Sequence, residues 1–209
     1  MRDYEELSRI HFNSQAHIYD EGCDNMFISK EGAISCRDVA ERIGSGQPIS
    51  LLDIGCGTGN LISLVSERRE GRFFGIDIAE NMVAAARKKN IKNACFSVGS
   101  AQNLPFDDGS FDIVTCTQSF HHYSQPEKAL SEVLRVLKNG GVYYLSDTGV
   151  SGIGAFIDNY LLFPFMKSGD FKCRGRKEVE KMVSKAGFAA VQGFKIARFI
   201  YTISAEKPV

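Results

Sequence analysis

The sequence predicts one α/β domain built on a mostly parallel sheet that is wound by helices, and three observations predict it. From residue 50 onward, short β-rich runs alternate with segments of helical period, which is typical of parallel strands joined by helices. The chain has 209 residues, 44% of them apolar, which suits one sizeable core but not two domains. Glycines at alternate positions follow the first β-rich run, as in a tight strand-to-helix turn.

Five short β-rich runs are expected to form the core strands. They are Ser50–Ile54, Arg72–Asp77, Ala94–Val98, Phe111–Cys116 and Gly141–Asp147. Helical periodicity predicts the connections Asn60–Arg69, Glu80–Lys89 and Pro126–Leu137. Pro126 suits a first helical turn, and Gly140 is expected to take the left-handed conformation that follows a helix end.

The two ends of the chain depart from this alternation. After Asp147 the pattern lapses, then Lys177–Ala186 resumes a helix that Gly187 ends. Residues 188–205 contain two β runs with no helix between them, so we expect them to pair antiparallel at the sheet edge. We therefore divide the chain into a lead-in or lid (1–46, with one helix at Glu31–Ile43), a core (50–147), a cap (148–174) and a final unit (175–209).

Composition argues against several functions. The chain has 25 basic residues (Lys and Arg) and 25 acidic residues (Asp and Glu), so no net positive charge draws it to nucleic acid or anionic lipid. None of the six cysteines forms a Cys-x-x-Cys pair, which favours a reduced, cytoplasmic setting. The longest apolar stretch, Gly152–Phe165, contains Asp158 and falls short of the roughly 20 residues that cross a bilayer, so we expect no membrane span.

The glycine-rich turn indicates a ligand site. The buried-strand sequence Leu51–Ile54 runs directly into Gly55, Gly57 and Gly59, where the absence of a Cβ lets a ligand approach the backbone. Asp77 ends the next strand, where its carboxylate can accept hydrogen bonds from both hydroxyls of a ribose. The two features together predict a nucleoside-containing cofactor; the alternative is a structural turn beside a surface Asp.

The spacing of the glycines bears on which nucleoside cofactor binds. A nicotinamide dinucleotide fingerprint has glycine or alanine three residues after its second glycine, whereas Asn60 stands there in this chain. The third glycine, Gly59, comes one residue early. The pattern therefore disfavours an NAD(P)-dependent oxidoreductase, which we keep as an alternative function.

Four motifs in order carry a family resemblance. They are Leu51–Gly59, Gly75–Met82, Asn103–Val114 and Glu132–Gly141. Together they resemble the class I S-adenosylmethionine (SAM)-dependent methyltransferases, in the small-molecule branch that includes the ubiquinone and menaquinone biosynthesis methyltransferases. The resemblance implies a single Rossmann-like, doubly wound, mostly parallel seven-stranded sheet with an antiparallel C-terminal edge strand. It also implies an enzyme of the EC 2.1.1 class that uses SAM as its cofactor.

The resemblance further implies the residues that contact SAM. The glycine segment would line the methionine part, Asp77 would hold the ribose, Ile78 and Met82 would pack on the adenine, and Ser100–Gln102 would meet the adenine edge. In this family an acidic residue usually stands where Ser100 stands, and a hydroxyl accepts more weakly than a carboxylate. The complete expected set is Asp53, Gly55, Cys56, Gly57, Gly59, Asp77, Ile78, Met82, Ser100, Ala101, Gln102, Gln118 and, as a lid contact, Tyr19.

The segment Gln118–Tyr123 contains the candidate catalytic residues. It follows the fourth strand, at the same sheet edge as the glycine turn, and by the resemblance His121 and His122 would face the active site. A His near the methyl group would serve as a base for a hydroxyl or carbon acceptor; the alternative is that the pair only closes the pocket. The sequence offers no third ligand at recognisable spacing, so no metal is expected.

The sequence says least about the molecule that accepts the methyl group. An aromatic-rich cap at Ser151–Lys172 would suit an apolar or planar small molecule, or its aromatic residues form the core of a capping helix. The expected partner is thus a small-molecule methyl acceptor, with no nucleic acid. Because the motifs describe only the cofactor pocket, a non-catalytic SAM-binding or nucleoside-binding module remains the other alternative.

Overall fold

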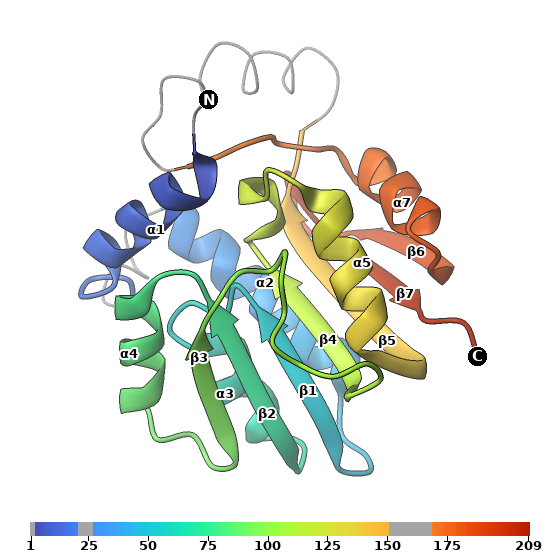
Figure 1. The fold of residues 1–209 in the computed structure, drawn as a ribbon, viewed down its shortest axis with the longest axis horizontal. Coiled ribbons are helices and arrows are strands. Elements are labelled where there is room, and N and C mark those ends of the chain that lie inside the picture. Colours follow the sequence, from blue (N-terminus) through green and yellow to red (C-terminus); the bar gives the residue numbers. More distant parts are fainter. Residues whose placement is uncertain (1–2, 21–26, 151–168) are drawn as a thin grey trace.

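The structure is a computed structural model that describes residues 3–20, 27–150 and 169–209 (Figure 1). At its centre is one seven-stranded sheet in the order β3-β2-β1-β4-β5-β7-β6. The strands are β1 (Ile49–Ile54), β2 (Gly71–Asp77), β3 (Ala94–Val98), β4 (Phe111–Thr117), β5 (Leu137–Thr148), β6 (Ala189–Lys195) and β7 (Ile200–Glu206). Strands β1 to β5 pair in parallel, whereas β7 lies antiparallel between β5 and β6. The predicted fold class is confirmed, and β6 rather than the last strand occupies the edge.

Helices cover both faces of the sheet, which makes the fold doubly wound (Figure 1). They are α1 (Tyr4–Gln15), α2 (Phe27–Ile43), α3 (Asn60–Ser66), α4 (Glu80–Lys88), the short 3-10 helix η2 (Phe120–His122), α5 (Pro126–Val136) and α7 (Arg176–Lys185). Successive residues of β1 point to opposite faces, so Leu52 packs in a core with α5 and α7, and Leu51 in a core with α2, α3 and α4. Because β1 contributes to both cores, all six of its residues are buried.

Helix α1 was not predicted. Its residues are polar, only Ser8 of the helix is buried, and the apolar periodicity that signals a helix is weak. The local signal was the N-cap, since the Asp3 carboxylate accepts a hydrogen bond from the Glu6 backbone N–H at 3.1 Å. The helix docks on the start of α4, where Arg9 pairs with Glu80 at 3.2 Å and the Asn13 side chain accepts from the Asn81 N–H at 2.8 Å.

The predicted role of Gly140 was wrong. Helix α5 ends at Val136, and its C-cap Leu137 has extended backbone angles, so β5 begins at once without a left-handed residue. Gly140 does have a positive φ of 74°, but it lies inside β5, where its N–H donates to the Lys207 carbonyl at 2.9 Å. In contrast, Gly187 follows α7 with a φ of 105°, as predicted.

Within the described residues, no helix combines the length and the apolar character needed to cross a membrane. The predicted aromatic cap lies mostly outside the described residues. Phe171 is described, and it packs edge-on against Tyr4 of α1 with ring centroids 4.9 Å apart.

Strand β1 carries one charged residue, Asp53, which is 1% exposed. Its Oδ1 accepts a hydrogen bond from the Thr115 hydroxyl at 2.8 Å, and its Oδ2 has no hydrogen-bond partner among the described residues. Burial raises the pKa of Asp53 from 3.8 to about 7, against the hydrogen bond from Thr115, which lowers it. In the unfolded chain this carboxyl ionises near pH 4, so between pH 4 and 7 the unfolded state loses its proton first and stability falls as pH rises.

We therefore expect Asp53→Asn to gain stability relative to the wild type as pH increases from 4 to 7, by up to roughly 1.4 kcal/mol per pH unit, and to show no further relative gain above pH 7. The Asn amide nitrogen replaces an oxygen that already lacks a partner. Urea unfolding at pH 4.5, 6 and 8 measures the difference, with exposed Asp107→Asn as the matched control. Parallel stability profiles for D53N and the wild type would contradict the raised pKa.

Candidate functional site

A cleft opens where the carboxyl ends of β1, β2 and β4 meet. Strand β1 pairs with β2 on one side and with β4 on the other, so successive connections leave it in opposite directions and a crevice forms at the strand ends. We call it the strand-end cleft. It is lined by Glu5, Ser8, Phe12, Tyr19, Gly55, Gly57, Asp77, Ile78, Met82, Ser100, Ala101, Thr117, Gln118, Ser119, His122 and Tyr123. A second hollow adjoins it on the other side of the glycine turn and shares Tyr19, Gly55, Gly57, Thr117 and Gln118.

The glycine turn is held against the end of β2. The backbone N–H groups of Gly55 and Cys56 both donate to the Ile76 carbonyl, at 2.8 and 3.1 Å. Gly55 has a φ of 69°, and a Cβ there would collide with the Ser119 side chain. Glycine is therefore required at this position both for its backbone angle and for the close packing of the turn.

Asp77 connects this turn to the adjacent strand. Its Oδ2 accepts from the Gly57 N–H at 2.8 Å, and its Oδ1 accepts from the Ala79 N–H at 2.9 Å. Burial raises the pKa of Asp77, and these two backbone donors oppose the rise. A carboxylate has about four lone-pair positions, so Asp77 can still accept hydrogen bonds from a ligand in the cleft that it lines.

The wall beyond Asp77 combines apolar and polar groups. Ile78, Met82 and Ala101 supply the apolar part. The polar part includes Ser100, whose hydroxyl donates a hydrogen bond to Glu5 Oε1 of helix α1 at 2.6 Å. The Gln102 amide donates to the same oxygen, also at 2.6 Å. Glu5 was not predicted as a site residue, since nothing in the local sequence of α1 indicates that this side chain reaches the end of β3.

The segment that follows α1 crosses over the glycine turn. Tyr19 lines the cleft, and the next residue, Asp20, accepts hydrogen bonds from the Thr58 hydroxyl at 2.7 Å and from the Asn60 amide at 3.1 Å. Asp20 also pairs with Lys89 at 2.9 Å. This segment is thereby anchored on α3 and α4, as a lid would be.

Gln118 lies at the end of β4 in a strained conformation. Its φ is 49°, in the left-handed region that non-glycine residues rarely adopt. The side chain is fixed at both ends, since its amide donates to Ser35 at 2.8 Å and its carbonyl accepts from Thr148 at 2.7 Å. Such strain persists only where surrounding contacts enforce it, and it is common at functional sites.

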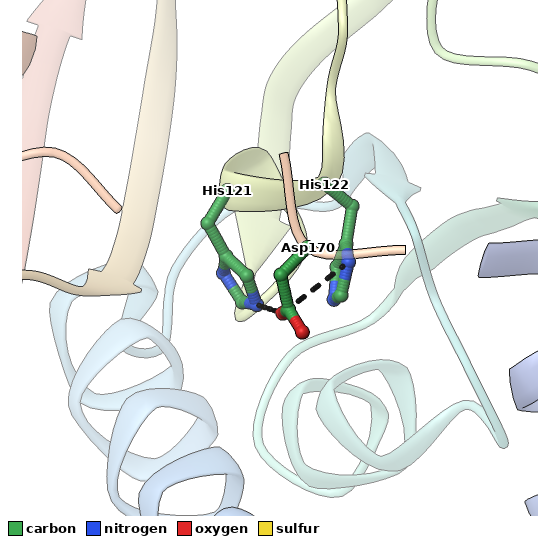
Figure 2. Close-up of side chains that lie close together, drawn as sticks. All are labelled: His121, His122 and Asp170. Atoms are coloured by element: carbon green, nitrogen blue, oxygen red, sulfur yellow. Dashed lines mark ion pairs between the residues drawn. The ribbon is translucent and has the colours of Figure 1, made fainter. Parts of the chain in front are cut away.

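The two histidines of η2 have different surroundings. His122 lines the cleft, and its pKa is lowered to about 3 by burial and by the neighbouring His121. His121 does not line the cleft, and its Nδ1 lies 2.6 Å from Asp147 Oδ1. Burial alone would lower the pKa of His121, but the Asp147 carboxylate outweighs it and the pKa is raised. Asp170 lies beside both rings (Figure 2).

The predicted site residues thus fall into three groups. Those that line the cleft are Gly55, Gly57, Asp77, Ile78, Met82, Ser100, Ala101, Gln118, Tyr19 and His122. Cys56 lines the second hollow instead. Neither the cleft nor the second hollow is lined by the remaining four, Asp53, Gly59, Gln102 and His121. Of these, Gly59 is the N-cap of α3, with a φ of 80°, and packs against Phe96.

Residues 52–145 match the family described as a methyltransferase domain. Over 101 residues the chain is 41% identical to the uncharacterized methyltransferase YcgJ of Bacillus subtilis, a match that covers 46% of this chain and 40% of that protein. It is also 26% identical over 211 residues to demethylmenaquinone methyltransferase of Staphylococcus aureus strain JH9, with 90% of this chain and 87% of that protein covered.

The fold is shared with solved structures. Phosphoethanolamine N-methyltransferase 2 of Haemonchus contortus, in complex with S-adenosyl-L-methionine, superposes with a TM-score of 0.80 and 18% identity, covering 100% of this chain and 61% of that one. At this level of identity the likeness concerns the fold. Residues 52–145 thus carry a methyltransferase domain, and the named relatives and the strand order agree with the SAM-dependent methyltransferase enzyme that the four motifs predicted.

Proposed function

We propose that this methyltransferase holds SAM in the strand-end cleft and moves its methyl group to a small-molecule acceptor. The observation that carries the proposal is that one cleft brings together the glycine turn, the Asp77 carboxyl and an apolar wall.

The cleft suits each part of SAM in turn. Asp77 would accept from the ribose hydroxyls, and Ile78 and Met82 would pack on the adenine. Glu5 would take the place of the acid that the family usually carries where Ser100 stands. Its Oε1 already accepts two hydrogen bonds at the end of β3, which places the carboxylate there. The remaining lone pairs of the Glu5 carboxylate would accept from the adenine amino group.

The methionine part would lie along Gly55 and Gly57, with Gln118 beside it and Tyr19 above. Asp53 lies in β1 two residues before this turn, and its Oδ2 has no partner among the described residues, so a cationic ligand nearby would favour the ionised form of that carboxyl. The sulfonium and ammonium groups of SAM supply such a charge.

When bound, SAM supplies a methyl group on a positively charged sulfur, which a nucleophile displaces in line. The chain's own contribution is to fix the position of the reacting groups and to exclude water from the cleft. Gly55 keeps the backbone close, and the anchored segment with Tyr19 covers the opening.

His122 is the histidine that would touch the acceptor, because its side chain lines the cleft and that of His121 does not. Its ring is neutral, so it would position the acceptor by a hydrogen bond or by packing. His121, held by Asp147, would act through His122 as a positioning residue. The small-molecule acceptor is consistent with the demethylmenaquinone methyltransferase relatives and with the zero net charge. The cytoplasmic setting expected from the cysteines stays a prediction.

Calorimetry with SAM and NAD tests the cofactor. SAM is expected to bind more tightly than NAD, and Asp77→Asn is expected to weaken SAM about tenfold or more, since a hydrogen bond to a charged acceptor contributes roughly 1.5–3 kcal/mol. Circular dichroism checks that D77N folds, and exposed Asp107→Asn is the control that should bind like the wild type. Tighter binding of NAD than of SAM would refute the assignment.

Catalysis is tested separately from binding. Incubation with SAM and a panel of small-molecule acceptors is expected to release S-adenosylhomocysteine with at least one of them, and His122→Ala is expected to slow that release. A protein that binds SAM yet releases no product with any acceptor, while the acceptors are shown to bind, would instead be a SAM-binding module.

The role of Glu5 has its own test. Glu5→Gln is expected to weaken S-adenosylhomocysteine about tenfold while leaving its inosine analogue, which lacks the amino group, nearly unaffected. The matched control is Glu6→Gln, because Glu6 is the next residue of α1 but pairs with Arg9 and does not line the cleft. Equal losses for the two ligands would mean that Glu5 acts only through the docking of α1.

A further inference from the structure

Three side chains that ligate metals in proteins converge at the edge of the strand-end cleft (Figure 2). His121 and His122 extend side by side from η2, and Asp170 approaches from the segment that leads to α7. Asp170 Oδ1 lies 3.5 Å from His121 Nε2 and 3.7 Å from His122 Nδ1. The three ligand atoms all lie within 4.8 Å of one another.

The first argument for a metal ion concerns His121. Its Nδ1 lies 2.6 Å from Asp147 Oδ1, and Asp147 Oδ2 also accepts from the His121 backbone N–H at 2.9 Å. Asp147 is 1% exposed and therefore holds the ring in one orientation. A proton on Nδ1 leaves the Nε2 lone pair directed at Asp170, which is the carboxylate–histidine–metal arrangement of protein metal sites.

The second argument concerns His122, and it is independent of the first. Its side chain is 9% exposed, and its Nδ1 has no hydrogen-bond partner among the described residues. A buried polar atom without a partner destabilises a fold, because it has lost its hydrogen bonds to water. This nitrogen faces the Asp170 carboxylate at a separation that is too long for a hydrogen bond but that a cation would bridge.

We propose that His121 Nε2, His122 Nδ1 and the Asp170 carboxylate bind one divalent transition-metal ion. Two imidazoles and one carboxylate suit Zn²⁺, Fe²⁺ or Co²⁺, whereas Mg²⁺ and Ca²⁺ prefer oxygen ligands. With bonds of about 2.1 Å, tetrahedral ligand atoms lie about 3.4 Å apart. The two contacts of Asp170 would therefore shorten by a few tenths of an ångström, and the two histidine nitrogens, which lie up to 4.8 Å apart, would have to approach each other further.

Three protein ligands leave coordination positions open, as in catalytic rather than structural sites. Because His122 lines the cleft, these positions face the space where the acceptor would lie. There the ion would bind an anionic oxygen of the acceptor and lower the pKa of a hydroxyl. Only this last step rests on the proposed function; metal binding itself does not.

The test is metal binding to the full chain without SAM or acceptor. After chelation and dialysis, Co²⁺ is expected to bind with one-to-one stoichiometry and a Kd on the order of 1 µM or tighter, to develop visible d–d absorption, and to be displaced by Zn²⁺. A thermal shift upward with Zn²⁺ provides a second readout.

Asp170→Asn and His122→Gln are each expected to weaken Co²⁺ at least about 100-fold, and Asp147→Asn about 10- to 100-fold. His17→Gln is the matched control, because His17 lies outside the cluster and should leave the affinity unchanged. Asp170 is in a loop, so its variant keeps the test valid if a histidine variant does not fold.

The proposal is overturned if the wild type binds no stoichiometric Co²⁺ or Zn²⁺, or if D170N binds as the wild type does. Charge transfer from thiolate in the Co²⁺ spectrum would place the ion on a cysteine and would also overturn it. Since SAM binding is measured separately, a failure here leaves the cofactor assignment standing, and a failure of SAM binding leaves this one standing.

Discussion

The site depends on one contact between the turn after β1 and the last residue of β2, the hydrogen bond from the Gly57 N–H to Asp77 Oδ2 at 2.8 Å. It ties the turn after β1 to the end of β2, and the Ile76 carbonyl strengthens the same joint by accepting from Gly55 and Cys56. The left-handed glycines allow the turn to come this close to β2. As a result the Asp77 carboxyl and the glycine backbone form one wall of the cleft.

The N-terminal region completes the cleft from outside the sheet. Helix α1 docks on the first turn of α4 through Arg9 and Asn13, which places Glu5 at the end of β3. The following segment is tied to the glycine turn by Asp20. These contacts are polar and partly exposed, and exposed ion pairs are each worth little. The aromatic contacts of Tyr4 with Phe171 and of Phe12 with His122 add to these polar contacts in docking α1.

The parts of the site that could be predicted are those with a local signal. A glycine turn after a buried strand and an acid at the end of the next strand are visible because their chemistry and spacing are local. Glu5, Asp147 and Asp170 carry no such signal, because their roles arise only when distant segments pack against the strand ends. The missed helix α1 shows the same limit, since tertiary docking rather than an apolar stripe holds it in place.

The sequence alone does not distinguish the two adjacent histidines, whereas packing gives each of them different surroundings and therefore different chemistry. His121 lies against a buried carboxylate, while His122 lies against Phe12, with ring centroids 5.1 Å apart, and its Nδ1 has no hydrogen-bond partner in the part of the chain that the structure describes. Around them the chain gathers acids at the strand ends, namely Asp53, Asp77, Glu5, Asp147 and Asp170, although its net charge is zero. A local negative field of this kind is invisible in the composition, and in a water-poor cleft it favours cations. The same field would favour both the sulfonium of SAM and the metal ion that we propose.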